Sequence, residues 1–132
     1  MPPKPAPDAP RPTDAELAIL RVLWTRGPST VRHVLDALNE ERATGYTTVL
    51  KLLQIMTDKQ LVARDESDRT HIYRASFSEA ATQRQLVDDL MDRAFGGSAM
   101  QLVMRALSGR QTSGADLAEI RRLLDEHDGD KR

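Results

Sequence analysis

The N-terminal half of the chain contains three segments in which apolar residues recur at intervals of three and four. This spacing is typical of helices that bury one face and expose the other. The apolar stripes are Leu17, Leu20, Leu23 and Trp24, then Val31, Val34, Leu35 and Leu38, and then Val49, Leu52, Leu53 and Met56. We therefore expect three consecutive helices, the third within residues 46–60.

Capping signals mark where the first two helices begin and end. Thr13 and Glu16 have the T-x-x-E spacing of a capping box, and Gly27-Pro28 should stop the first helix near Arg26. Ser29 is then expected to cap the second helix.

Two short segments rich in β-branched and aromatic residues follow the third predicted helix. They are LVARD, residues 61–65, and THIYRAS, residues 70–76, and the polar sequence ESDR separates them. This pattern predicts a two-stranded hairpin. Three helices followed by a hairpin is the order of a winged helix-turn-helix, in which the third helix enters the major groove of DNA.

Helical spacing returns at Ser78 and continues to the end of the chain. Gly96-Gly97 interrupts it, Ser98 can cap the next helix, and Ser113 with Asp116 resembles a capping box for a last one. Three short amphipathic helices make a poor core of their own, so we expect them to pair two copies of the chain into a homodimer. The candidate dimerisation residues are Leu86, Leu90, Met100, Val103, Met104, Leu107, Leu117, Ile120 and Leu124.

The expected fold is therefore mainly α with a small β-hairpin. Residues 1–12 contain six of the seven prolines and are interpreted as a disordered tail. Residues 13–77 are expected to form the winged helix-turn-helix domain, and residues 78–128 the helical dimerisation region. The tail is interpreted as a solvated leader, with a basic arm that contacts DNA as the alternative.

Charge is distributed unevenly along a chain whose formal net charge is −1. Residues 42–76 hold six Lys or Arg against four Asp or Glu, whereas residues 77–132 hold eight against ten. A basic surface on the winged domain is thus compatible with the neutral total. The chain has no cysteine and no apolar run suited to a signal peptide or a membrane span, so a cytoplasmic protein without membrane insertion is expected.

The third helix carries the residues expected to contact DNA bases. Opposite its apolar stripe lie Thr47, Leu50, Lys51, Gln54 and Asp58. Lys51 suits guanine and Gln54 suits adenine, while Leu50 could contact a thymine methyl group. The alternative for each of these residues is that it is an ordinary solvent-exposed helix residue with no contact to DNA.

Other polar residues are expected to contact the DNA backbone. Thr47 and Thr48, with the Tyr46 hydroxyl, lie at the start of the third helix, where phosphate can be held. The predicted hairpin adds Arg64, Arg69, His71 and Arg74 for the sugar-phosphate backbone or the minor groove. Arg69, at the tip, is the strongest single candidate. Arg32 and His33, near the start of the second helix, are interpreted as solvent-exposed residues, with contact to the DNA backbone as the alternative.

No sequence motif of an enzyme, a metal site or a cofactor site is present. The chain lacks nucleophile elbows, phosphate-binding glycine loops and H-E-x-x-H, and its three histidines lie far apart on different predicted elements. We expect a protein that is not an enzyme and needs no cofactor or metal.

Three stretches of the sequence resemble the BlaI/MecI family of penicillinase repressors. They are ELAILRVLW, GYTTVLKLLQIMTDKQLV and HIYRA, and the likeness extends over roughly residues 13–127. Its most specific parts are the opening of the third helix at 46–49, the turn at 59–62 and the F-G-G-S break at 95–98. The resemblance implies a homodimeric repressor that binds a dyad-symmetric operator of double-stranded DNA. Members of this family control β-lactam resistance genes.

In the best-known members of the family, a membrane-bound sensor protease cleaves the repressor in its dimerisation region, between asparagine and phenylalanine. Here the corresponding stretch, QLVMRALSG, places Arg105 and Ala106 at that point, and the cysteine motif of copper-responsive relatives is missing. The inducing signal therefore stays open. A winged-helix adaptor that binds proteins without specific DNA binding is the alternative function, since the net charge is slightly negative.

Overall fold

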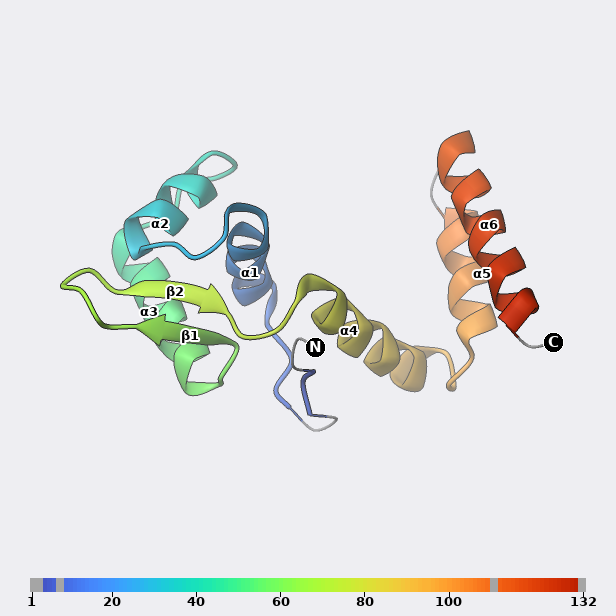
Figure 1. Cartoon of the computed structure of the whole chain (residues 1–132), viewed down its shortest axis with the longest axis horizontal. Coiled ribbons are helices and arrows are strands. Elements are labelled where there is room, and N and C mark those ends of the chain that lie inside the picture. Colours follow the sequence, from blue (N-terminus) through green and yellow to red (C-terminus); the bar gives the residue numbers. More distant parts are fainter. Residues whose placement is uncertain (1–3, 7–8, 110–111, 131–132) are drawn as a thin grey trace. The chain divides into compact units, whose positions relative to one another are not determined.

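The computed structural model describes residues 4–6, 9–109 and 112–130. Over these residues the chain forms six helices and one two-stranded sheet, as the sequence predicts (Figure 1). The elements are α1 (Asp14–Arg26), α2 (Val31–Asn39), α3 (Tyr46–Asp58), β1 (Val62–Asp65), β2 (Ile72–Ala75), α4 (Glu79–Ala94), α5 (Ala99–Gly109) and α6 (Gly114–Asp130).

The first helix begins and ends where its capping signals predict. The backbone N–H of Glu16 donates to the Thr13 hydroxyl, and the N–H of Thr13 donates to the Glu16 carboxylate, which completes the capping box. At its other end, Gly27 has φ +84° and its N–H donates to the Leu23 carbonyl. The helix therefore stops at Arg26, as expected.

The prediction that Ser29 caps the second helix is wrong by one residue. Thr30 is the N-cap, and its hydroxyl accepts from the His33 N–H at 3.1 Å. Ser29 is buried and its backbone pairs with Tyr73 of β2 in both directions, at 2.9 and 2.8 Å. The backbone of Ser29 is thus already part of the sheet, which leaves the capping position to Thr30.

The hydrophobic core of the described residues lies between α1, α2, α3 and the hairpin. Val49, Leu53 and Met56 of α3 are fully buried, in agreement with the predicted stripe. In α1 the most buried apolar residue is Ile19, outside the expected stripe, because α1 contacts α2, α3 and β2 and so buries more than one narrow face. Trp24 packs against the core, and its indole N–H donates to the Phe77 carbonyl at 2.9 Å.

A partly buried ion pair connects the start of α1 with the end of α3. The Lys59 ammonium lies 3.0 and 2.9 Å from the two Glu16 carboxylate oxygens, and Glu16 is 2% exposed. Burial raises the pKa of the Glu16 carboxyl, but the Thr13 N–H and the Lys59 charge together outweigh burial, so the pKa lies below its ordinary value. Glu16 is therefore held as a carboxylate within the core.

The turn from α3 into the wing places a non-glycine residue in the left-handed region. Gln60 has φ +66°. Its N–H donates to the Thr57 carbonyl at 3.0 Å, and the Leu61 N–H donates to the Met56 carbonyl at 2.9 Å. These two bonds form a Schellman motif, in which the left-handed position is usually glycine.

We predict that replacing Gln60 by Gly stabilises the fold by about 1 kcal/mol, because glycine adopts this φ without a steric cost. Replacing Gln83 by Gly, at an exposed position inside α4, should instead cost about 1 kcal/mol. Urea unfolding at one protein concentration measures both. Equal destabilisation by the two changes would contradict a strained Gln60.

The chain divides into two compact units, Met1–Asp88 and Asp89–Arg132, with the boundary inside α4. Beyond Thr82 no described residue is buried. Gly96 and Gly97 both have positive φ and end α4, as predicted, and the Ser98 and Ser113 hydroxyls accept from the N–H groups of Gln101 and Asp116 near the starts of α5 and α6.

The proline-rich segment is the part of the chain predicted to be a disordered tail. Residues 1–3 and 7–8 of it lie outside the described residues. In the part that is described, the Ala9 N–H donates to the Ala6 carbonyl, and the Gln85 amide of α4 donates to the Ala9 carbonyl at 3.3 Å. This part of the segment therefore contacts α4.

Candidate nucleic-acid interface

Helix α3 has one fully buried side and one exposed polar side. Thr47, Thr48, Lys51 and Gln54 are exposed, whereas Val49, Leu53 and Met56 on the opposite side of the helix pack into the core. Within the described part of the chain, Lys51 forms no ion pair and Gln54 no side-chain hydrogen bond. The donors of both side chains are therefore available to a ligand outside the helix.

The apolar residue available on α3 is not the one that the sequence predicts. Leu50 is half-buried and packs against the core, because it lies one turn before Leu53. Ile55 is 38% exposed and lies one turn after Lys51. Ile55 escaped prediction because an isoleucine in an apolar-rich helix is normally assigned to the core.

The start of α3 contacts the start of α2 through an arginine and a tyrosine. The Arg32 guanidinium carbon lies 5.5 Å from the centre of the Tyr46 ring, which is the geometry of a cation–π contact. Tyr46 is 46% exposed. The N-cap of α3 is Gly45, so no side chain caps the start of this helix. Arg32 is exposed, as expected, and no pattern in the sequence predicts its contact with Tyr46, because the contact depends on how α2 and α3 pack.

The register of the wing separates two of its arginines. Val62 pairs with Ala75, Ala63 with Arg74, and Arg64 with Tyr73. Directly paired residues point to the same face of a sheet, and neighbours along a strand point to opposite faces. Arg64 thus shares the face of buried Tyr73 and Arg74 lies on the other face, so the wing does not present these two arginines on one surface.

The three wing arginines also differ in their acidic neighbours. Arg64 pairs with Glu66, Nε to Oε1 at 2.6 Å, and the Tyr73 side chain and this carboxylate raise the pKa of Arg64. The Ser67 N–H donates to the Asp65 carboxylate at 2.9 Å and lowers its pKa, and the charge of Arg74 lowers it further. Arg69 is exposed and makes no ion pair within the described residues, so its charge is the least compensated of the three.

Candidate dimerisation residues are exposed on the C-terminal helices. Leu90 is 47% exposed, Met100 69%, Val103 46%, Met104 58%, Leu107 39% and Leu124 61%, whereas Leu86, Leu117 and Ile120 are half-buried. Val87 of the first unit and Leu123 of the second are also exposed, at 39% and 52%. So many exposed apolar side chains are unusual for a chain that stays alone in water.

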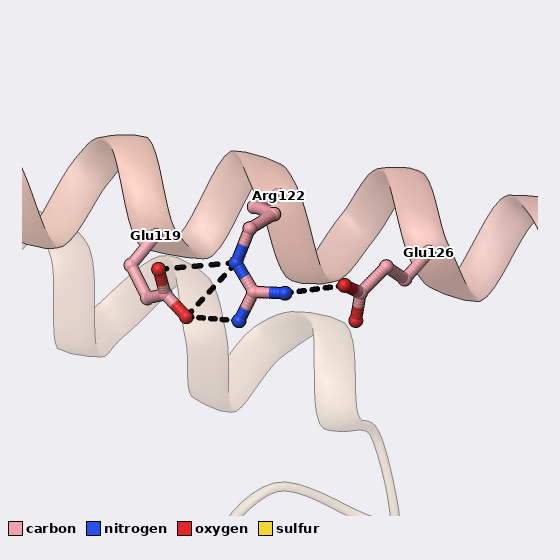
Figure 2. A network of polar contacts seen from close by, with 3 residues as sticks. All are labelled: Glu119, Arg122 and Glu126. Atoms are coloured by element: carbon pink, nitrogen blue, oxygen red, sulfur yellow. Dashed lines mark hydrogen bonds and ion pairs between the residues drawn. The ribbon is translucent and has the colours of Figure 1, made fainter.

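The opposite side of α6 carries a charged network. Figure 2 shows Arg122 between Glu119 and Glu126, with its Nε donating to the Glu119 carboxylate at 3.1 Å and a further bond to Glu126. The Arg122 hydrogen bond lowers the pKa of Glu119. Leu124 follows two residues after Arg122 and therefore points to the other side of the helix. The helix is thus divided into a solvated charged side and an apolar side.

The described residues hold neither a candidate metal site nor a membrane span. No group of three or more His, Asp or Glu side chains could hold a metal ion in the part of the chain that the structure describes. Across the same residues, no helix is long and apolar enough to cross a membrane.

Comparison with known proteins gives one consistent match. A family model described as penicillinase repressor matches residues 12–126. The transcriptional regulator BlaI of Mycobacterium tuberculosis is 35% identical over 115 residues, which cover 86% of this chain and 82% of that protein. The penicillinase repressor of Bacillus licheniformis is 22% identical over 123 residues, which cover 93% and 96%. A solution structure of monomeric Bacillus licheniformis BlaI with the blaP half-operator is 20% identical, with a TM-score of 0.49, and covers 56% of this chain and 90% of that one.

Proposed function

Because the chain belongs to the penicillinase repressor family, and is thus a DNA-binding transcriptional repressor and not an enzyme, we propose that it acts as a homodimer on a dyad-symmetric operator. Residues 13–77 of each copy bind one half-site, and residues 78–128 join the copies. The family assignment favours this function over that of a winged-helix adaptor for other proteins.

The exposed side of α3 is the observation that carries the proposal. It presents Lys51 and Gln54 with free donors. The opposite side of the helix is fixed in the core by three fully buried residues, Val49, Leu53 and Met56. In the major groove Lys51 suits guanine and Gln54 suits adenine, and Ile55 offers a larger free apolar surface to a thymine methyl than Leu50 does. These side chains read the sequence of the operator.

The backbone contacts of the proposal come from two places. Tyr46, Thr47 and Thr48 at the start of α3 approach phosphate, and Arg69 at the wing tip supplies a charge without an acidic partner in the described residues. Arg64 must break its ion pair with Glu66 before it can bind phosphate. The charge of Arg74 is partly compensated by Asp65. We therefore rank Arg69 above the other two wing arginines.

Homodimer formation is supported by the apolar surface of the C-terminal helices. Ten large apolar residues are exposed among those described, and eight of them lie between Val87 and Leu124. A second copy of the chain is the surface that matches them by symmetry. A dimer also places two α3 helices on one duplex, which a palindromic operator requires.

We include cleavage by a sensor protease in the proposal only if α5 can unwind at the cleavage point. Arg105 and Ala106 lie inside α5, so the peptide bond between them is part of a helix. A protease that cuts this bond needs α5 to unwind locally first, which is feasible because no residue of α5 is buried.

We predict different losses for two substitutions on this surface. Arg69→Ala should weaken binding to every duplex by about fivefold and reduce the salt slope by about one per bound chain, since it removes a phosphate contact. Gln54→Ala should weaken binding about tenfold to a duplex selected from random sequences by the intact protein, and hardly at all to an arbitrary duplex. Fluorescence anisotropy at several salt concentrations measures both.

The matched control for Arg69 is Arg84→Ala, which removes an exposed arginine that pairs with Asp88 on α4. It should bind like the wild type. If random-sequence selection yields no preferred duplex, or if binding at micromolar protein ignores salt, the proposed function is wrong.

A further inference from the structure

The contact between α2 and α3 carries an inference that rests on the proposed function. We propose that Arg32 and Tyr46 act as one unit that binds the DNA phosphate backbone, with the tyrosine ring holding the arginine in position. This assigns Arg32 of α2 to the interface, whereas the sequence favours a solvent-exposed residue at that position.

The orientation of Arg32 is the first reason. Asp36 lies four residues further along the same helix, within the usual reach of a helical ion pair. Yet no ion pair joins these two described residues, and the guanidinium instead lies over the Tyr46 ring, 5.5 Å from its centre. The arginine is therefore directed towards the start of α3 and not along its own helix.

The free donors of the pair are the second reason. A guanidinium has five N–H donors, and none of those of Arg32 forms a hydrogen bond with a described residue. The Tyr46 hydroxyl is equally without a bond there, and both side chains are exposed. A cation–π contact uses the charge of the guanidinium without using its N–H groups, so they remain available for a planar, two-pronged contact with phosphate.

The ring also lowers the entropic cost of binding. A free arginine side chain must give up much of its rotamer freedom when it is immobilised. An arginine already held against an aromatic face gives up less of this freedom on contact with DNA. Tyr46 is thus a positioning residue for Arg32, as well as a donor through its own hydroxyl.

The surroundings of the pair are those of the proposed DNA-binding side. Thr47, Thr48 and Lys51 follow Tyr46 along the exposed side of α3 and include no acidic side chain. Up to residue 86, the exposed large apolar side chains among the described residues are Tyr46 and Ile55, and both lie on α3. The ring is therefore presented on the helix proposed to meet DNA.

The test uses full-length protein and two probes, namely the duplex selected from random sequences by the wild type and an arbitrary duplex of the same length. Arg32→Gln should weaken binding to both about fivefold and reduce the salt slope by about one per bound chain. The control is Arg21→Gln, which removes an exposed arginine of α1 and should change neither quantity. Circular dichroism melting verifies that both variants fold.

Variants of Tyr46 separate positioning from direct contact. Tyr46→Leu removes the ring and should weaken binding at least as much as Arg32→Gln, whereas Tyr46→Phe keeps the ring and should lose less. In the Arg32→Gln background, Tyr46→Leu should have a clearly smaller effect than alone, because the two act as a unit.

Three outcomes would overturn the inference while leaving the proposed function intact. In the first, the wild type binds DNA with salt dependence and sequence selectivity, but Arg32→Gln binds as well as the control Arg21→Gln. Another is a loss confined to the selected duplex, which would assign Arg32 to bases. The third is full additivity of the two substitutions. Absence of salt-dependent binding by the wild type would instead refute the proposed function.

Discussion

Replacing Met100 by Asp is expected to weaken dimerisation about a hundredfold and operator binding by a similar factor. Met100 is 69% exposed and lies in the first turn of α5, so the change should barely affect folding of a single chain. In the proposed dimer, symmetry places two such carboxylates in an apolar interface, where each loses water without gaining a partner. Operator binding falls because the second half-site is then no longer bound by a linked copy.

The neighbouring substitution Gln101→Asp is the matched control. Gln101 is also exposed and also in the first turn of α5, so both aspartates gain the same favourable interaction with the helix dipole, but Gln101 lies off the apolar stripe. Sedimentation across a range of concentrations gives the dimer dissociation constant, and anisotropy with the selected duplex gives operator affinity. A Met100→Asp variant with the wild-type dissociation constant would remove α5 from the interface.

Local signals in the sequence predict most of the helices and strands. The capping box at Thr13 and Glu16 and the break at Gly27 depend on residues within one turn of each other, and the apolar spacing of α3 depends on one helix alone. Such features are set by short-range geometry, so periodicity and capping rules predict them. The cap of α2 escaped prediction because two adjacent hydroxyl residues compete for it, and a distant strand occupies Ser29.

Features that depend on contacts between distant segments could not be predicted. The Glu16–Lys59 pair joins residues 43 positions apart, and the approach of Arg32 to Tyr46 follows from how α2 crosses α3. The sequence gives no reason to distinguish Arg64 from Arg74, but the strand register places them on opposite faces of the sheet. Apart from Leu50 and Ile55, the exposed face of α3 could be predicted because one helical period orders its residues, whereas the wing depends on register and on the pairing of each charge.

Loss of the Glu16 charge is expected to destabilise the winged domain by about 2 kcal/mol at pH 7, measured as Glu16→Gln in urea unfolding at one protein concentration. The pair connects α1 to the residue that ends α3, and so fixes the approach to the Gln60 turn and the wing. Lys59→Met should cost at least as much, because it leaves a buried carboxylate without its cation. Glu40→Gln, which breaks the exposed pair with Arg26, should cost about 0.5 kcal/mol or less.

The acid dependence of the same pair follows from the direction of its pKa shift. The pKa of Glu16 in the folded chain lies below its ordinary value of 4.5, so the unfolded chain takes up a proton at this carboxyl first as the pH falls. Its contribution is therefore fully present above about pH 5 and is lost as the pH falls through the folded pKa. The difference between wild type and Glu16→Gln should stay constant from pH 7 to 5 and shrink below 4.5. A difference that persists unchanged at pH 3 would show that Glu16 acts through packing and hydrogen bonding and not through its charge.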